Sequence, residues 1–158
     1  MTPKDILDLN GDSSSSPLLD TLRRLDDCFT AEGISYAVVG GLAVVRNGAT
    51  RTTVDIDILF PGNEWGMEIP MPHPADIGER DIGLGAVFAS PAALLEIKCA
   101  VYRKKLREDG MEIAAKDLYD VTERLKARGD ALTEEDLRLM NPVIASHLRA
   151  IRKKVLGR

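Results

Sequence analysis

The sequence predicts a small α+β fold whose C-terminal segment is helical. Three observations lead to this class: apolar residues recur at helical spacing after Pro17, short β-rich runs end at glycines, and helix-start signals gather toward the C-terminus. A chain of 158 residues with 44% hydrophobic and 29% charged residues suits one domain, or a domain with a short appendage.

Glycine, proline and serine divide the N-terminal part of the chain into four expected elements. Residues 1–16 end in four serines and are expected to be a mobile leader. The elements that follow are a helix from Pro17 that Gly33 ends, a strand at Ile34–Val39, a short helix at Leu42–Arg46 and a strand at Val54–Phe60.

The C-terminal part begins with a stretch, Pro61–Ser90, in which prolines and glycines leave only a short strand around Met67–Ile69. Three helices are expected after it. They start at Pro91, near Ala114 and at a cap formed by Thr133–Asp136, and Asn141-Pro142 kinks or breaks the last one. These boundaries predict a leader at 1–16, a domain at 17–127 and a helical extension with a basic end at 128–158.

Composition excludes several classes of function. The formal charge of −4 gives no overall basic field for nucleic acid, and 4% aromatic residues are few for a base-stacking platform. No apolar run approaches the roughly 20 residues of a membrane span, and the N-terminus lacks the apolar stretch of a signal peptide. Two cysteines make a reducing, cytoplasmic setting the default expectation.

The expected strand at Val54–Phe60 carries two aspartates. Asp55 and Asp57 are two positions apart, so both point to one face of the strand. Aspartate is disfavoured in strands and like charges repel, but a bound divalent cation reverses that penalty because magnesium prefers hard oxygen ligands. The alternative is a half-exposed strand with a polar outer face.

Two other segments before this strand suit a phosphate. Gly40-Gly41 stands at a turn from a strand into a short helix, where the backbone can approach a phosphate and offer unpaired N–H donors. Arg51-Thr52-Thr53 can add a guanidinium fork and hydroxyls. An ordinary tight turn and a polar loop are the alternatives.

Lys98 interrupts an apolar stripe on the helix that starts at Pro91. A lysine there must either extend to solvent or meet a carboxylate or phosphate. Asp117, at the edge of the apolar face of the next helix, is the expected partner, and the Lys98 ammonium is expected to point toward Asp55 and Asp57. Asp120 with Arg124 is expected to form a solvated surface pair.

Together these segments resemble a known family. Val38–Ala43 and Arg51–Leu59 look like the signature of the polymerase-beta-like nucleotidyltransferases. Leu95–Ala100 and Lys116–Val121 are similar to the third and fourth motifs of the minimal, AbiEii-like nucleotidyltransferases, a group that includes toxin–antitoxin components. The resemblance covers about residues 18–127.

The resemblance implies a mixed sheet flanked by helices that binds a nucleoside triphosphate with Mg²⁺ or Mn²⁺. By its motifs, Asp55 and Asp57 hold the metal ions. Gly40 and Gly41 cradle the triphosphate, with help from Arg51 and Thr52. Lys98 contacts the triphosphate, and Asp117 completes the polar end of the site. An acceptor hydroxyl then attacks the α-phosphate and pyrophosphate leaves.

Glu68 is the expected third carboxylate of a two-metal site, since it stands between the apolar residues Met67 and Ile69. Ten residues separate it from Asp57, which suffices for a return strand beside Val54–Phe60. This connection is shorter than the one usual in the family, and a loop glutamate in solvent is the alternative.

Three functions stay open at this point. One is a nucleotidyltransferase whose nucleotide and acceptor (protein, tRNA or small molecule) the sequence does not specify. The second is a catalytically degenerate relative that binds nucleotide or a partner protein as an antitoxin or regulatory component. The third is a nucleic-acid-binding module that uses the basic C-terminus, which the acidic total charge disfavours.

Overall fold

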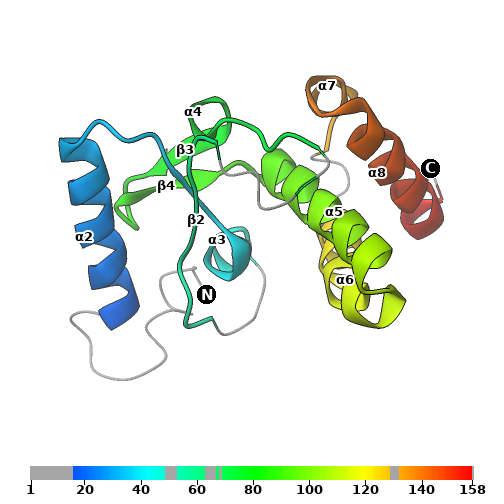
Figure 1. Cartoon of the computed structure of the whole chain (residues 1–158), viewed down its shortest axis with the longest axis horizontal. Helices are drawn as coiled ribbons and strands as arrows, with labels where there is room; N and C mark the ends of the chain where they lie inside the picture. The colour runs from blue at the N-terminus through cyan, green and yellow to red at the C-terminus, as the bar shows by residue number, and fades with distance from the viewer. Residues whose placement is uncertain (1–15, 49–52, 63–66, 68, 129–131, 158) are drawn as a thin grey trace. The chain divides into compact units, whose positions relative to one another are not determined.

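A computed structural model describes residues 16–48, 53–62, 67, 69–128 and 132–157 (Figure 1). Over these residues the chain is α+β, as the sequence predicts, and its sheet is small, mixed and four-stranded. It forms two compact units: one within Met1–Asn63 and Pro72–Leu94, the other within Glu64–Met71 and Leu95–Arg158. The expected boundaries of the leader (1–16), the domain (17–127) and the extension (128–158) are not tested by this division and stay a prediction.

The first unit contains the sheet and three helices. Its elements are α2 (Pro17–Ala31), β1 (Ala37–Val39), α3 (Gly40–Arg46), β2 (Asp57–Leu59), α4 (Pro74–Ile77), β3 (Gly78–Asp81) and β4 (Ala86–Ala89). The strands lie in the order β2-β1-β4-β3 (Figure 1). β1 runs antiparallel to β2 and parallel to β4, and β3 and β4 form an antiparallel pair.

Apolar side chains from both helices and strands make the core of this unit. α2 packs against β4, and α3 packs against β1 and β2. The fully buried side chains include Leu22, Val38, Leu42, Leu59 and Phe88. Because α3 is buried along most of its length, from Gly41 to Val45, the turn that starts it is held firmly on the sheet.

Both strands expected around the glycine pair are shorter than the sequence predicts. The expected strand at Ile34–Val39 is confirmed only over Ala37–Val39, and the one at Val54–Phe60 only over Asp57–Leu59. Residues 54–56 cannot extend β2, because β1 turns into α3 at Gly40 and the ladder ends at the pair Val39–Asp57. Val54 therefore has no strand opposite it and is 82% exposed.

The stretch 61–90 differs most from expectation. The strand expected around Met67–Ile69 is wrong at both described positions, because neither Met67 nor Ile69 lies in a strand, and Glu68 lies outside the described residues. Prolines at 70 and 72 supply no N–H for a ladder. The structure instead has the short helix α4 and the β3–β4 hairpin, which the sequence reasoning missed.

The second unit is helical and agrees well with the sequence. Its helices are α5 (Pro91–Glu108, whose first turn belongs to the first unit), α6 (Met111–Arg128), α7 (Glu134–Leu139) and α8 (Pro142–Leu156). Thr133 forms the expected capping box with Asp136. Asn141 caps a separate helix at Pro142, so the expected last helix is broken rather than kinked.

Packing of α8 against its neighbours closes this unit. The fully buried side chains include Leu125, Leu137, Ile144 and Leu148. Two polar contacts join α5 to the start and middle of α8: Glu96 Oε1 accepts the Asn141 N–H at 2.9 Å, and Arg103 Nη1 lies 2.8 Å from His147 Nδ1. Over the described part of the chain, no helix is both long and apolar enough to cross a membrane.

Candidate functional site

The glycine pair and Asp57 meet at one end of the sheet in the first unit. β1 ends at Val39, Gly40 starts α3, and Asp57 pairs with Val39 in the ladder between β1 and β2. The register therefore brings the β2 aspartate to the turn between β1 and α3. The resemblance implies that this turn and Asp57 belong to one site, and in the sheet the two lie next to each other.

Gly40 is in direct contact with the Asp57 side chain. A Cβ built on Gly40 would lie 1.9 Å from Oδ2 and 2.7 Å from Cγ of Asp57. Gly40 also has a φ of +62°, in the left-handed region that favours glycine. Both observations require glycine here, and together they place a carboxylate against the backbone that begins α3.

Asp55 lies two residues before this contact and outside β2, so the expectation that both aspartates lie in one strand is wrong. Both Asp55 and Asp57 are exposed, and no basic side chain in the described part of the chain pairs with either carboxylate. Thr53 Oγ1 donates to the Asp55 carbonyl at 3.4 Å. Two exposed carboxylates are a donor set that fits a hard divalent cation such as Mg²⁺.

Three predicted site residues, Arg51, Thr52 and Glu68, lie outside the described residues. Over the residues that are described, no group of three or more His, Cys, Asp or Glu side chains could hold a metal ion. The expected role of Glu68 as a third carboxylate stays a prediction.

In the second unit, Lys98 meets the partner that its position predicts. Its Nζ lies 3.4 Å from Asp117 Oδ1, and this confirms the expected pairing. The same ammonium lies 3.0 Å from Asp120 Oδ2. The expectation that Lys98 also points toward Asp55 and Asp57 stays a prediction.

Asp120 corrects one expectation. Its side chain is 14% exposed and lies 3.0 Å from Lys98, so Asp120 is not the solvated surface residue that was expected. α5 and α6 run antiparallel after the short connection at Asp109-Gly110, which turns Asp120 toward Lys98. A local i, i+4 rule could not have found a contact between residues this far apart in sequence.

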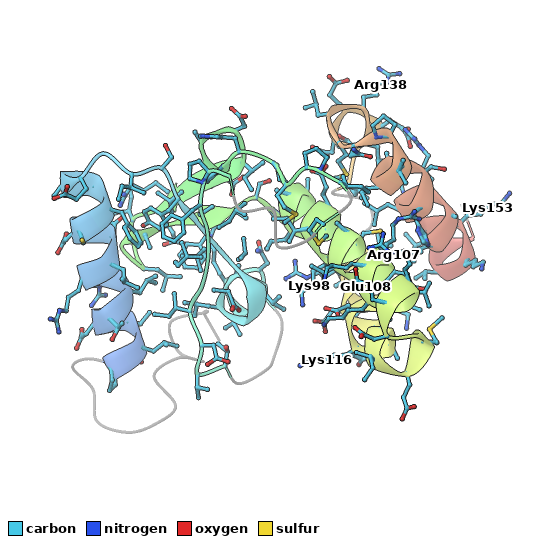
Figure 2. All side chains as sticks on the ribbon, viewed as in Figure 1. Lys98, Arg107, Glu108, Lys116, Arg138 and Lys153 are labelled. Carbon is cyan, nitrogen blue, oxygen red and sulfur yellow. The ribbon has the colours of Figure 1, made fainter. Side chains whose placement is uncertain are left out.

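A second lysine reaches the same group, and the sequence reasoning missed it. Lys105 Nζ lies 2.6 Å from Asp117 Oδ2. The sequence did contain a signal for this contact. Lys105 follows Lys98 by seven residues, which is close to two helical turns, so both side chains lie on the same face of α5. Figure 2 shows Lys98 projecting from the side of α5 that lies away from α8.

The basic C-terminus is partly neutralised within its own unit. Glu134 of α7 pairs with two arginines of α8. Its Oε2 lies 3.0 Å from Arg149 Nη2, and its Oε1 lies 3.7 Å from Arg152 Nη1. Lys153 (Figure 2) is exposed in the last turn of α8. Lys154 is exposed there as well, and cations at this end interact favourably with the helix dipole.

Comparisons of the chain with protein-family models, with curated proteins and with solved structures found no match.

Proposed function

We propose that this chain is a Mg²⁺-dependent nucleotidyltransferase that moves a nucleoside monophosphate from a nucleoside triphosphate to an acceptor hydroxyl, in a cytoplasmic setting. The observation that carries the proposal is the contact between Gly40 and the Asp57 carboxylate where β1 turns into α3. This contact joins the two features of the sequence that separately suit a phosphate and a metal ion.

A phosphate at the Gly40-Gly41 turn would meet both backbone N–H donors and the Asp57 carboxylate. Two anions at one place repel each other, so a triphosphate can bind beside Asp57 only with a cation between them. Asp57 and Asp55 would hold that Mg²⁺, with Glu68 as the proposed third carboxylate. When bound, the ion neutralises charge on the triphosphate and on the leaving pyrophosphate.

The other residues in the proposal bind and orient the nucleotide. Arg51 and Thr52 offer a guanidinium and a hydroxyl to the phosphates, and the turn at Gly40-Gly41 offers backbone N–H groups. Lys98 and Asp117 enter the proposal through the resemblance of their motifs, with Lys98 as a phosphate ligand. Fixing the triphosphate in this way positions the α-phosphate for attack by the acceptor hydroxyl.

A labelling experiment tests the reaction. The purified chain is incubated with each nucleoside triphosphate, labelled at either the α- or the γ-phosphate, with Mg²⁺ or Mn²⁺ and candidate protein, tRNA or small-molecule acceptors. We expect the α-label on the acceptor and the γ-label in released pyrophosphate. Asp57→Asn should abolish transfer, whereas Asp27→Asn, at an exposed aspartate of α2, should not.

Transfer of the γ-label would contradict the proposal, because it indicates a kinase. Magnesium-dependent binding without any transfer would instead favour a catalytically degenerate protein that binds nucleotide or a partner as an antitoxin or regulatory component.

A further inference from the structure

The Asp117 carboxylate lies between two lysines of α5. Its Oδ2 is 2.6 Å from Lys105 Nζ and its Oδ1 is 3.4 Å from Lys98 Nζ, so the closer ammonium is that of Lys105. The seven-residue spacing places both lysines on one face of α5, and Asp117 of α6 lies across from them. Lys105 thus belongs to the same cluster of ion pairs as Lys98, Asp117 and Asp120. The sequence did not predict Lys105 as a site residue.

Burial determines how this cluster divides its charge. Asp117 is only 4% exposed, and a carboxylate so buried needs a compensating cation. Lys105 makes the short contact and is the more exposed lysine, with 37% of its side chain exposed against 16% for Lys98. The main counter-charge of Asp117 therefore comes from Lys105, and Lys98 makes only the longer contact.

The ammonium of Lys98 keeps donor capacity as a result. An ammonium has three N–H donors, and the contacts of Lys98 with described residues are the long one to Asp117 and one of 3.0 Å to Asp120. A phosphate oxygen can then accept the third N–H of Lys98 while the 3.0 Å ion pair with Asp120 stays in place.

We propose that Lys105 is a positioning residue that keeps Lys98 available for phosphate by compensating the charge of Asp117. This inference rests on the proposed function, in which Lys98 is a phosphate ligand. Without Lys105, the uncompensated Asp117 carboxylate draws the Lys98 ammonium to itself, and a phosphate must compete with a buried carboxylate for it.

The experiment measures binding of inorganic tripolyphosphate with Mg²⁺ to the full chain by titration calorimetry. Lys105→Met is compared with Lys104→Met, which removes the neighbouring lysine from its pair with Glu108 on the same helix. Lys98→Met serves as the variant without the ligand itself. We expect Lys105→Met to weaken binding about tenfold and Lys104→Met to change it less than about twofold.

Lys105→Arg provides the rescue. It restores the positive charge beside Asp117, so its affinity should return to within about twofold of the wild type. A side chain needed only for packing would not be restored by a larger and differently shaped cation. If Lys105→Met does not fold, Lys105→Gln keeps an N–H donor without the charge and is expected to show the same loss.

The outcomes separate the two claims. If the wild type does not bind tripolyphosphate, or binds it as well after Lys98→Met, the role of Lys98 in the proposed function fails and this inference fails with it. If Lys98→Met loses binding while Lys105→Met or Lys105→Gln matches Lys104→Met, the inference alone is overturned. An equal loss in Lys105→Arg and Lys105→Met overturns it as well.

Discussion

The Asp57 carboxylate occupies the space that a side chain on Gly40 would need. A methyl group at Gly40 would lie 1.9 Å from Asp57 Oδ2, far inside van der Waals contact. The contact exists because the ladder between β1 and β2 ends at the Val39–Asp57 pair, one residue before the turn into α3. It fixes an acidic side chain beside a backbone turn.

Gly40→Ala should destabilise the chain more than the same change at another glycine of positive φ. Gly33 has a φ of +65° with nothing within 4 Å of a built Cβ, so Gly33→Ala should cost only the left-handed conformation, about 1–2 kcal/mol. Gly40→Ala adds the collision with Asp57 and should cost about 1–3 kcal/mol more. Urea unfolding of both variants measures the difference, and equal losses would contradict the contact.

A buried network at Asp26 ties α2 to the sheet. Arg80 donates to both carboxylate oxygens of Asp26 at 2.8 and 3.1 Å, and Tyr36 donates its hydroxyl to the same group. These contacts, chiefly the hydrogen bonds from Arg80, hold the pKa of Asp26 below its ordinary value of 3.8. Burial is the main cause that raises the pKa of Tyr36 to about 12, so Tyr36 stays a donor at neutral pH.

Asp26→Asn should therefore destabilise the chain by about 1–3 kcal/mol at neutral pH. Because the folded-state pKa of Asp26 is lowered, its contribution is present above pH 3.8 and is lost as the pH falls through the folded-state value. The difference in unfolding free energy between wild type and Asp26→Asn should shrink when urea unfolding is repeated at about pH 3. A difference that stays constant with pH would rule out an ionised, paired Asp26.

Glu96→Gln should stabilise the chain at neutral pH. Burial raises the pKa of Glu96 above its ordinary value of 4.5, so the ionised side chain costs stability once both folded and unfolded states have lost the proton. Glutamine keeps an oxygen that accepts the Asn141 N–H. Thermal unfolding should give a higher Tm for Glu96→Gln at pH 7, and the gain should vanish as the pH falls to about 4.5.

A lower Tm for Glu96→Gln at pH 7 would show that the carboxylate charge stabilises the cap of α8. The matched control is Glu135→Gln on α7, where the glutamate is exposed and the same change should leave the Tm almost unchanged.

The helical half of the fold could be predicted because its boundaries are local. Pro91, the Thr133–Asp136 capping box and Asn141-Pro142 each act through the backbone of their own turn, and the structure has helix ends at all three. The β3–β4 hairpin was missed for the opposite reason. β3 reads Gly-Glu-Arg-Asp, and its charged side chains have partners far away in the sequence: Asp81 lies 3.0 Å from Arg46, and Arg80 lies 2.8 Å from Asp26.

The candidate site likewise contains contacts that the sequence could predict and contacts that it could not. Pairing of Lys98 with Asp117 could be predicted, because a lysine within an apolar stripe needs a nearby anion. The contacts of Asp120 and Lys105 depend on how α5 and α6 are aligned, and single-helix patterns do not determine that alignment. The Gly40–Asp57 contact likewise depends on a strand register that short, alternating runs leave open.

The central claim, that the junction of Gly40 and Asp57 binds a magnesium nucleotide, is tested most directly by ligand-dependent thermal stabilisation. The Tm of wild type, Asp57→Asn and Asp27→Asn is measured with each nucleoside triphosphate, with and without Mg²⁺. Because a ligand that binds only the native state raises the Tm, we expect a magnesium-dependent increase in the wild type and in Asp27→Asn, and none in Asp57→Asn. An equal increase in Asp57→Asn would contradict the claim.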